Sequence, residues 1–308
     1  MLLTGCFAAG QQTGDRGGHR PAQNQAKSQA QSQVPSRLPA TSESKKPARA
    51  PSGSPGTRAS APTDVNSVLA RSLEPIRTRS GTRVSVAVMD PRDGRRAVYG
   101  SRAHVTASIV KVDILAALLL RAQRERRPLT RWEASTAASM IQSSDNASAN
   151  ALWRRIGRGR GLTDANRALG LTSTQAGPGP HWGLTRTTAA DQLALLSSVF
   201  DDHSPLKGPS RDLIQTLMGQ IDDDQDWGVS AAGSHWQLKN GWLPRSHSQR
   251  WEINSMGRVK AHGRIFYLVI LSHGSRTMSH GISAVEQAAQ SAVRALCSTP
   301  PLVSPIVG

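Results

Sequence analysis

Residues 105–114 read VTASIVKVDI, an apolar run that contains one serine and one lysine. Ser108 and Lys111 are three residues apart, so on a helix they share one face within a single turn. The run continues as KVDILAALLLRAQ, which is apolar nearly all round and therefore predicts a buried, central helix. A lysine at such a helix start must reach water, find a partner or lose its proton.

The spacing Ser-x-x-Lys alone is weak evidence, because the chain also contains it at Ser42–Lys45 and Ser204–Lys207. Only Ser108–Lys111 opens an apolar helix. Burial there can lower the pKa of the lysine, and a neutral amine can take the proton of the serine hydroxyl. The helix start also offers backbone N–H groups to an oxyanion. The pair is therefore a candidate nucleophile and base.

Strand patterns lie on both sides of a helical block. The pattern of apolar residues predicts helices at residues 64–76 and 283–297. It predicts two strands before the helical block, at residues 82–90 and 95–100, and three strands after it, at residues 234–242, 250–263 and 264–273. Strands from both ends of the domain favour one antiparallel sheet covered by helices, an α+β fold with an inserted all-helical part. The predicted boundaries are 63–107 and 232–299 for the sheet part and 108–231 for the helical part.

Composition separates the first 62 residues from the rest. Residues 11–61 contain almost no large apolar side chains, which predicts a disordered polar tether. The net charge of the chain is +17, and residues 1–62 contain eight Lys and Arg residues but only two acidic residues. Basic runs such as RAQRERRPLTR could bind nucleic acid or an anionic cell envelope. They lack interleaved aromatic residues and any recognisable nucleic-acid module, so we expect no nucleic-acid partner.

Cys6 and Cys297 are the only cysteines, which predicts no disulfide framework. Cys6 closes LLTGC, which resembles the bacterial lipobox, although five residues before it are fewer than a leader peptide needs. We expect lipidation at Cys6 and an extracytoplasmic location, as a cell-surface lipoprotein or a secreted protein. No stretch is long and apolar enough to span a bilayer, so membrane association would run through the lipid anchor.

Two further motifs follow the serine–lysine pair in order. SSDNAS at 143–148 places Ser144 and Asn146 at the head of a helical segment, and LKNGW at 238–242 places Lys239, Asn240 and Gly241 on a strand. With this motif order the domain resembles class A β-lactamases and penicillin-binding proteins. The resemblance covers nearly all of residues 64–297 and includes the segments 140–157, 162–170 and 184–196. It implies the serine β-lactamase/penicillin-binding-protein fold.

The resemblance implies a role for each motif residue. Ser108 is the acylated nucleophile, Lys111 its base or proton relay, and Ser144 passes the proton to the leaving nitrogen. Asn146 binds Lys111 and the substrate amide. The substrate-binding set is Lys239, Asn240, Gly241 and Trp242, in which Lys239 attracts a carboxylate. The backbone N–H groups of Ser108 and Trp242 form the oxyanion hole.

Three departures from the family pattern affect the expected chemistry. Asn240 stands where the family has Thr or Ser, and Ser108 and Ser144 are separated by an unusually short helical block. No glutamate occurs between Glu133 and Glu252, so the Glu-x-x-Leu-Asn loop that supplies the deacylating base is absent. It should fall near residues 170–183, where only His181 titrates. We therefore expect slow deacylation, with His181 as a candidate base.

The expected function is a serine acyl-transfer hydrolase that a β-lactam or a D-alanyl amide acylates at Ser108. Two alternatives are a D,D-carboxypeptidase acting on peptidoglycan peptides and a non-catalytic envelope lipoprotein that binds muropeptide or β-lactam. We expect a monomer without cofactor. We also expect no metal, because the histidines form neither a close pair nor an HExxH motif.

Overall fold

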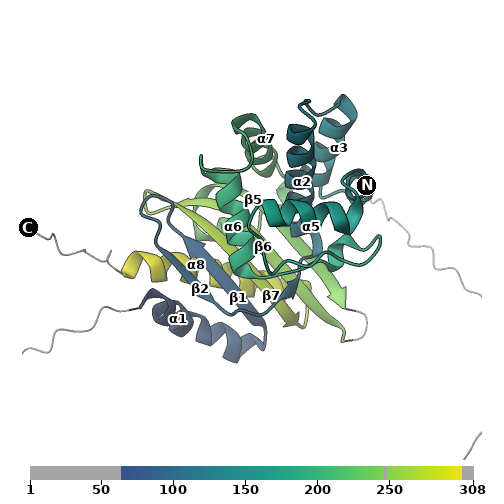
Figure 1. The fold of residues 1–308 in the computed structure, drawn as a ribbon. Helices are drawn as coiled ribbons and strands as arrows, with labels where there is room; N and C mark the ends of the chain where they lie inside the picture. Colours follow the sequence, from purple (N-terminus) through teal and green to yellow (C-terminus); the bar gives the residue numbers. More distant parts are fainter. Residues whose placement is uncertain (1–63, 246–247, 300–308) are drawn as a thin grey trace, which may run out of the picture. The chain divides into compact units, whose positions relative to one another are not determined.

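An antiparallel five-stranded sheet, ordered β2-β1-β7-β6-β5, forms the centre of the fold (Figure 1). The computed structural model describes residues 64–245 and 248–299. The strands are β1 (Arg83–Met89), β2 (Arg96–Tyr99), β5 (Ser234–Arg245), β6 (Arg250–Ala261) and β7 (Arg264–Ser275). A short second sheet joins β3 (His104–Val105) to β4 (Arg186–Thr187). The first and last parts of the domain thus build one sheet, as the strand patterns predict.

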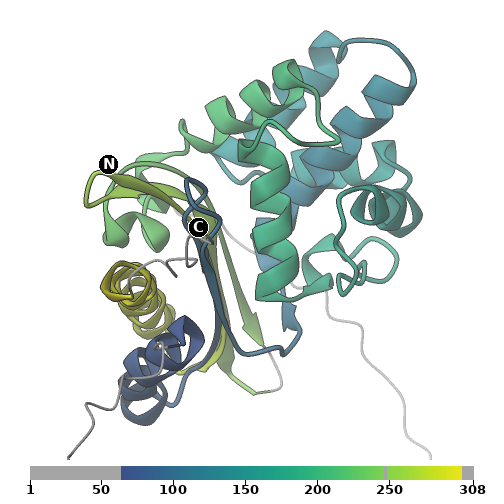
Figure 2. The ribbon, with the colours of Figure 1, turned by 60° about the vertical axis from the view of Figure 1, so that its left-hand side comes forward.

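Helices cover both faces of the sheet. They are α1 (Val65–Ser80), α2 (Val110–Arg124), α3 (Arg131–Gln142), α4 (Asn146–Arg155), α5 (Arg158–Ala168), α6 (Ala189–Phe200), α7 (Gly208–Met218) and α8 (Met278–Ser298). Short 3₁₀ turns are η1 (Ala107–Ile109), η2 (Trp182–Leu184), η3 (Asp223–Gln225) and η4 (Val229–Ala232). Figure 2 shows α1 and α8 on one side of the sheet and the inserted helices on the other.

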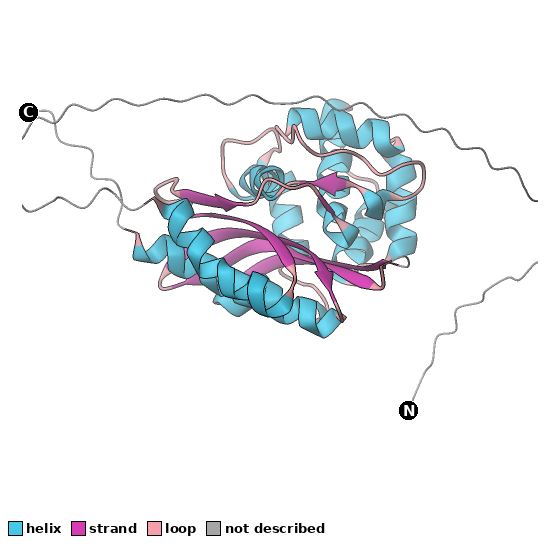
Figure 3. Ribbon diagram, turned by 90° about the horizontal axis from the view of Figure 1, so that it is seen from below, coloured by secondary structure: helices cyan, strands magenta, loops and turns pink. Residues whose placement is uncertain are grey.

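The two faces of the sheet bury different cores. Val84, Val86 and Val88 of β1 share a core with α1 and α8 on one face, and Ala87 belongs to the core with α2 and α6 on the other. Such two-sided burial explains why successive residues of β1, from Val84 to Val88, are all buried, the polar Ser85 included. Figure 3, coloured by secondary structure, shows helices on both sides of the magenta sheet. The α+β class with an antiparallel sheet is confirmed.

Helix α2 is the central helix, as the apolar run predicts. Twelve of its fifteen residues are buried, and those less buried lie in its last turn. The helix begins later than the apolar run, however. Val105 pairs with Arg186 across β3 and β4, and Ser108 lies in the 3₁₀ turn η1. Ala107 takes a φ of 49°, a left-handed conformation that a non-glycine residue adopts only when its surroundings enforce it.

Helices α3 and α4 run in opposite directions beside α2. A capping box between Thr130 and Glu133 starts α3, and Asp145 caps α4 by accepting a hydrogen bond from the Ser148 N–H. Arg155, the last residue of α4, reaches Glu133 in the first turn of α3. The starts of α2 and α4 and the end of α3 therefore lie at one end of these helices.

Elements and boundaries agree closely with the sequence patterns. Strands β6 and β7 meet at residues 261–264, as predicted, whereas β5 extends to Arg245 and α8 begins five residues early, at Met278. The predicted tether, residues 1–62, and its Cys6 lie outside the described residues. Within the described ranges, no helix combines the length and the hydropathy needed to cross a bilayer.

Candidate active site

Ser108 is held against the sheet by two residues of the neighbouring strands. Gly241 of β5 lies so close that a Cβ there would come within 2.7 Å of the Ser108 nitrogen and 2.8 Å of the Ile109 nitrogen. Asn254 of β6, which pairs with Gly241, donates hydrogen bonds of 2.9 Å to the carbonyl oxygens of Val105 and Thr106. The glycine of the Lys-Asn-Gly motif is needed here for close backbone approach.

Lys111 is fully buried and its amine is bonded to the second motif. Its Nζ donates to the Ser144 carbonyl oxygen at 2.5 Å, to Ser144 Oγ at 3.0 Å and to Asn146 Oδ1 at 2.9 Å. Burial lowers the pKa of Lys111 to about 7, against the opposing influence of the nearby Asp145 carboxylate. An amine with this pKa is substantially neutral at physiological pH and can accept a proton.

The hydroxyl of Ser108 has no hydrogen bond to Lys111 in the described part of the chain, although the pair lies within one turn. Ser144 is the residue that joins Lys111 to the start of α4. It has a φ of 51°, which turns its carbonyl oxygen and its hydroxyl toward the same amine. The structure thus brings together Ser108, Lys111, Ser144 and Asn146, the four residues predicted to be catalytic.

Lys239 is a second fully buried lysine in this region. Its Nζ makes only long hydrogen bonds, 3.4 Å to Gln225 Oε1 and 3.3 Å to the Asn240 carbonyl oxygen. Burial and the charge of Lys111 lower the pKa of Lys239 to about 7, while Asp222 and Asp224 oppose this. Two coupled amines therefore face this region, and each would gain from an anionic substrate group.

The side-chain amide of Asn240 is bonded to the protein backbone, although this residue is predicted to bind the substrate. Its Nδ2 donates to the carbonyl oxygens of Gln225 and Trp227, at 2.7 and 2.8 Å. Both amide hydrogens are therefore in use, and a contact between this amide and a substrate carboxylate would require one of these bonds to break. Trp242 is half-buried, and its ring lies 6.0 Å from that of Trp227. Substrate binding by Asn240 and Trp242 stays a prediction.

The segment that lacks the family glutamate places a tryptophan at the site. The ring centroid of Trp182 lies 4.9 Å from Lys111 Nζ, and its Nε1 donates to Asn150 Oδ1 of α4 at 2.7 Å. Sequence reasoning missed both Trp182 and Asn150, because a tryptophan in a loop is usually interpreted as a packing residue. The available signal was that Trp182 lies inside the segment where the family glutamate is missing.

His181, the predicted deacylation base, is exposed and precedes η2. A Cβ on Gly177 would come within 2.1 Å of the His181 carbonyl oxygen, so the loop packs tightly against itself. The Thr185 hydroxyl accepts a hydrogen bond from the Gly177 N–H, which closes the same loop. The hydrogen bonds of His181 within the described ranges are made by its backbone, to Pro178 and Leu184, and do not join its ring to Ser108 or Lys111. Its catalytic role stays a prediction.

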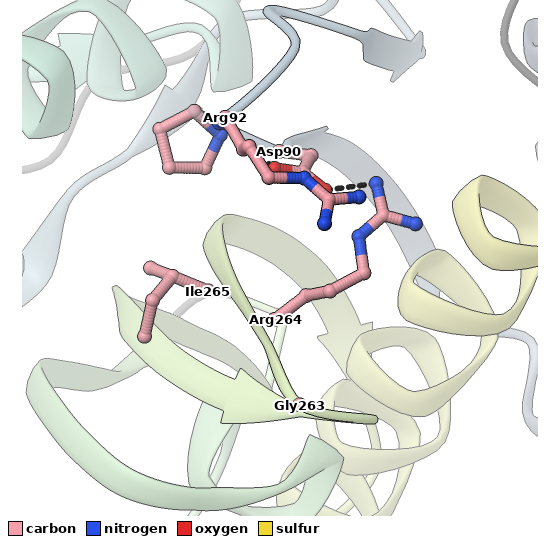
Figure 4. Close-up of a pocket in the computed structure, with 6 residues that line it drawn as sticks. Asp90, Arg92, Gly263, Arg264 and Ile265 are labelled. Carbon is pink, nitrogen blue, oxygen red and sulfur yellow. Dashed lines mark hydrogen bonds and ion pairs between the residues drawn. The ribbon is translucent and has the colours of Figure 1, made fainter.

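Other sites in the described ranges are less suited to chemistry. No three His, Cys, Asp or Glu side chains gather there to hold a metal ion. A cavity of about 400 Å³ lies at the turn between β6 and β7 and is lined by Asp90, Pro91, Arg92, Gly263, Arg264 and Ile265 (Figure 4). Asp90 and Arg264 form an ion pair across it, which indicates a structural role.

Solved class A β-lactamases share this fold. The structure matches a variant of the last common ancestor of Gram-negative class A β-lactamases with a TM-score of 0.63 and 21% identity, over 74% of this chain and 98% of that one. It matches a β-lactamase of Xanthomonas campestris with a TM-score of 0.63 and 19% identity, over 76% of this chain and 99% of that one. It matches a class A β-lactamase of Bacteroides cellulosilyticus with a TM-score of 0.66 and 15% identity, over 76% of this chain and 99% of that one.

A curated relative is the "Putative lipoprotein LppW" of Mycobacterium bovis, 30% identical over 122 residues. The match spans 39% of this chain and 39% of the relative, so this chain covers about two fifths of the relative's length. The same protein name and the same values apply to Mycobacterium tuberculosis.

The family profile described as "Beta-lactamase enzyme family" matches residues 133–296. That range contains the Ser144–Asn146 motif and the Lys239–Gly241 motif. Ser108 and Lys111 precede the range, and the fold places Lys111 against the first motif and Ser108 against the second. The profile match covers more than half of the sequence, and the solved structures share its architecture. The chain therefore belongs to the β-lactamase enzyme family.

Proposed function

We propose that this chain is a serine acyl-transfer hydrolase that a β-lactam or a D-alanyl amide acylates at Ser108. The observation that carries the proposal is the buried amine of Lys111, one turn after Ser108 and bonded to Ser144 and Asn146. Such an amine can act as the general base that a serine hydroxyl needs.

In the proposed reaction, Ser108 Oγ attacks the amide carbonyl and gives its proton to neutral Lys111. The proton travels through a water molecule or after rotation of the serine side chain, because the two groups are not directly bonded in the structure. Ser144 then passes a proton to the leaving nitrogen. The N–H groups of Ser108 and Trp242 hold the oxyanion, and each such donor contributes roughly 3–4 kcal/mol.

We propose that hydrolysis of the acyl-enzyme is slow. No glutamate stands in the segment where the family has its deacylating base, and Trp182 occupies the space over Lys111. Loss of a general base lowers a rate by about 10²–10⁴. Because its ring lies over Lys111, Trp182 also favours the second candidate function, that of an envelope protein that binds β-lactam or muropeptide without turnover. A D,D-carboxypeptidase uses the same acylation step and differs in the substrate it accepts.

A location in the cell envelope fits this chemistry, since β-lactams and peptidoglycan peptides are met there. The name of the mycobacterial relative describes a lipoprotein, and the LLTGC motif of this chain ends in Cys6. We propose that Cys6 carries a lipid that anchors the chain outside the membrane.

Labelling with a fluorescent penicillin tests the proposal. The wild-type chain should become covalently labelled, Ser108→Ala should abolish labelling, and Lys111→Ala should slow it by about 10²–10⁴. Lys207→Ala, from the Ser204–Lys207 pair outside the site, is the matched control and should label normally. Unchanged labelling of Ser108→Ala would place the nucleophile elsewhere, and no labelling of the wild-type chain would favour the non-catalytic candidate or a substrate other than penicillin.

A further inference from the structure

The end of the inserted helices that lies away from Ser108 is rich in arginine. Residues 121–133 and 154–158 contain eight arginines and two glutamates. They cover the end of α2, the start of α3, the end of α4 and the start of α5. The turn between α2 and α3 lies far from the sheet (Figures 1 and 2).

Both glutamates are already neutralised by three of these arginines. Glu133 is buried and forms ion pairs with Arg127 at 2.7 Å and with Arg155 at 2.8 Å. Glu125 forms ion pairs with Arg121 at 2.8 Å and with Arg127 at 2.7 Å. Arg121 also donates to the Arg155 carbonyl oxygen at 2.6 Å, which ties the end of α2 to the end of α4. This network fixes the helix ends as one surface.

Five further arginines project from the same surface without such neutralisation. Within the described residues, none of the five takes part in an ion pair, and all are exposed. They are Arg124, Arg126, Arg131, Arg154 and Arg158. We call these five, together with Trp132, the arginine face.

Trp132 is 51% exposed and is the one exposed tryptophan in the described part of the protein. It lies beside Arg131 in the first turn of α3. An indole combines an apolar ring with a polar N–H, and therefore favours the headgroup region of a membrane. Surfaces that stack nucleic-acid bases instead carry several aromatic rings along a groove.

We propose that the arginine face docks on the anionic phospholipids of a membrane surface. The five free arginines supply the charge complementarity, and Trp132 supplies the apolar contact. A single acyl chain holds a protein only marginally, and a basic surface is the kind of second signal that makes anchoring stable. The face would serve this purpose beside a lipid on Cys6 and does not depend on acylation of Ser108.

The geometry leaves the active site free when the face is docked. Arg124 ends α2, whose first turn contains Lys111, so at 1.5 Å per residue the face and the site are roughly 20 Å apart. A protein docked in this way would present Ser108 away from the lipid, toward substrates in the envelope.

Vesicle co-sedimentation tests the proposal with the full 308-residue chain carrying Cys6→Ser, so that no acyl chain contributes. The face variant carries four substitutions: Arg124→Gln, Arg126→Gln, Arg154→Gln and Arg158→Gln. The control variant loses the same charge from exposed arginines elsewhere: Arg71→Gln, Arg96→Gln, Arg250→Gln and Arg276→Gln. Vesicles of phosphatidylcholine are compared with vesicles that also contain phosphatidylglycerol as a minor component.

The wild-type chain should bind only the anionic vesicles, and its affinity should fall with added salt. The face variant should lose at least about tenfold in affinity and the control variant less than about threefold, since the attraction of a basic residue to an anionic surface acts only within a Debye length of that surface. Trp132→Ala, which removes an exposed side chain and should leave the fold intact, should weaken vesicle binding at least about threefold.

Two results would overturn the proposal. Equal losses in the two four-residue variants would mean that the whole basic chain is responsible for binding. Tighter binding to DNA or to a soluble anionic wall polymer than to vesicles, with the same dependence on the face, would assign the arginine face to a different partner.

Discussion

The ring of Trp182 lies over the amine of Lys111, with 4.9 Å between Nζ and the ring centroid. The indole N–H donates a hydrogen bond of 2.7 Å to Asn150 Oδ1, which fixes the orientation of the ring. A cation–π contact stabilises a charged amine, whereas burial favours the neutral one, and here burial dominates the pKa of Lys111.

The first prediction follows from this arrangement. A nitrocefin progress curve at high enzyme concentration should show a burst of about one equivalent followed by slow turnover, because Lys111 is the proposed acylation base and residues 170–183 contain no glutamate to serve in deacylation. Trp182→Glu places a carboxylate beside Lys111 and opens space for water. It should raise the steady-state rate at least about tenfold, below the full worth of a well-placed general base.

Two variants separate charge from space in this experiment. Trp182→Phe keeps a ring and should retain the slow steady state, while His181→Ala reports whether the exposed imidazole contributes. Fast linear turnover of the wild-type chain that is insensitive to His181→Ala would show that another group supplies the deacylating base.

A second prediction concerns pH. Since the pKa of Lys111 is lowered to about 7 by burial, the amine is protonated and inactive as a base below that pH. The rate of labelling by a fluorescent penicillin should therefore rise about tenfold per pH unit up to about pH 7 and then level off.

Asp145→Asn is the matched test of this assignment. The Asp145 charge raises the pKa of Lys111, and asparagine can still cap α4. The variant should shift the midpoint of the pH profile to lower pH while the plateau rate stays within a few fold. A profile that is flat from mildly acidic to mildly alkaline pH in both proteins would exclude Lys111 as the titrating base.

Much of the fold follows from local patterns in the sequence. The apolar run of α2 and the β-branched residues of β1 and β7 predict buried elements, because exposing so many large apolar side chains to water is unfavourable. The antiparallel sheet built from both ends follows from the order of these elements. The 3₁₀ turn that carries Ser108 does not follow, because it depends on Gly241 and Asn254, which lie far later in the chain.

The candidate site divides in the same way. Ser108, Lys111, Ser144 and Asn146 are predicted as one group from motif order, and the fold brings them together. The orientation of Asn240 could not be predicted, since it depends on two backbone carbonyl oxygens of the segment before η4. Trp182 begins the short 3₁₀ turn η2 within a long loop, and no local sequence pattern specifies its contact with Lys111.

The third prediction concerns Gly241. An added Cβ would meet the backbone nitrogens of Ser108 and Ile109 at 2.7 and 2.8 Å, and backbone atoms cannot move aside as a flexible side chain can. Gly241→Ala should therefore displace Ser108 and slow penicillin labelling about a hundredfold, in line with the sensitivity of catalysis to shifts of about 1 Å. Gly208→Ala, at a position with open space around it, should label at the wild-type rate. Normal labelling by Gly241→Ala would show that β5 does not position the nucleophile.

The fourth prediction concerns the stability cost of Lys239, whose pKa is lowered to about 7 by burial and by the charge of Lys111. In the unfolded chain this lysine keeps the ordinary lysine pKa of 10.5, so between about pH 7 and 10.5 the unfolded state binds more protons. The free energy of unfolding should therefore rise with pH across this window, and the cost of the lysine is fully present below it.

Lys239→Met tests this cost, because it removes the amine and nearly keeps the volume. It should stabilise the protein near pH 6 by about 1–3 kcal/mol, and the gain should shrink toward pH 10. Urea unfolding at the two pH values measures the difference, with the exposed Lys260→Met as a control expected within about 0.5 kcal/mol of wild type. A destabilised Lys239→Met protein near pH 6 would mean that the long hydrogen bonds to Gln225 and Asn240 outweigh the cost of burial.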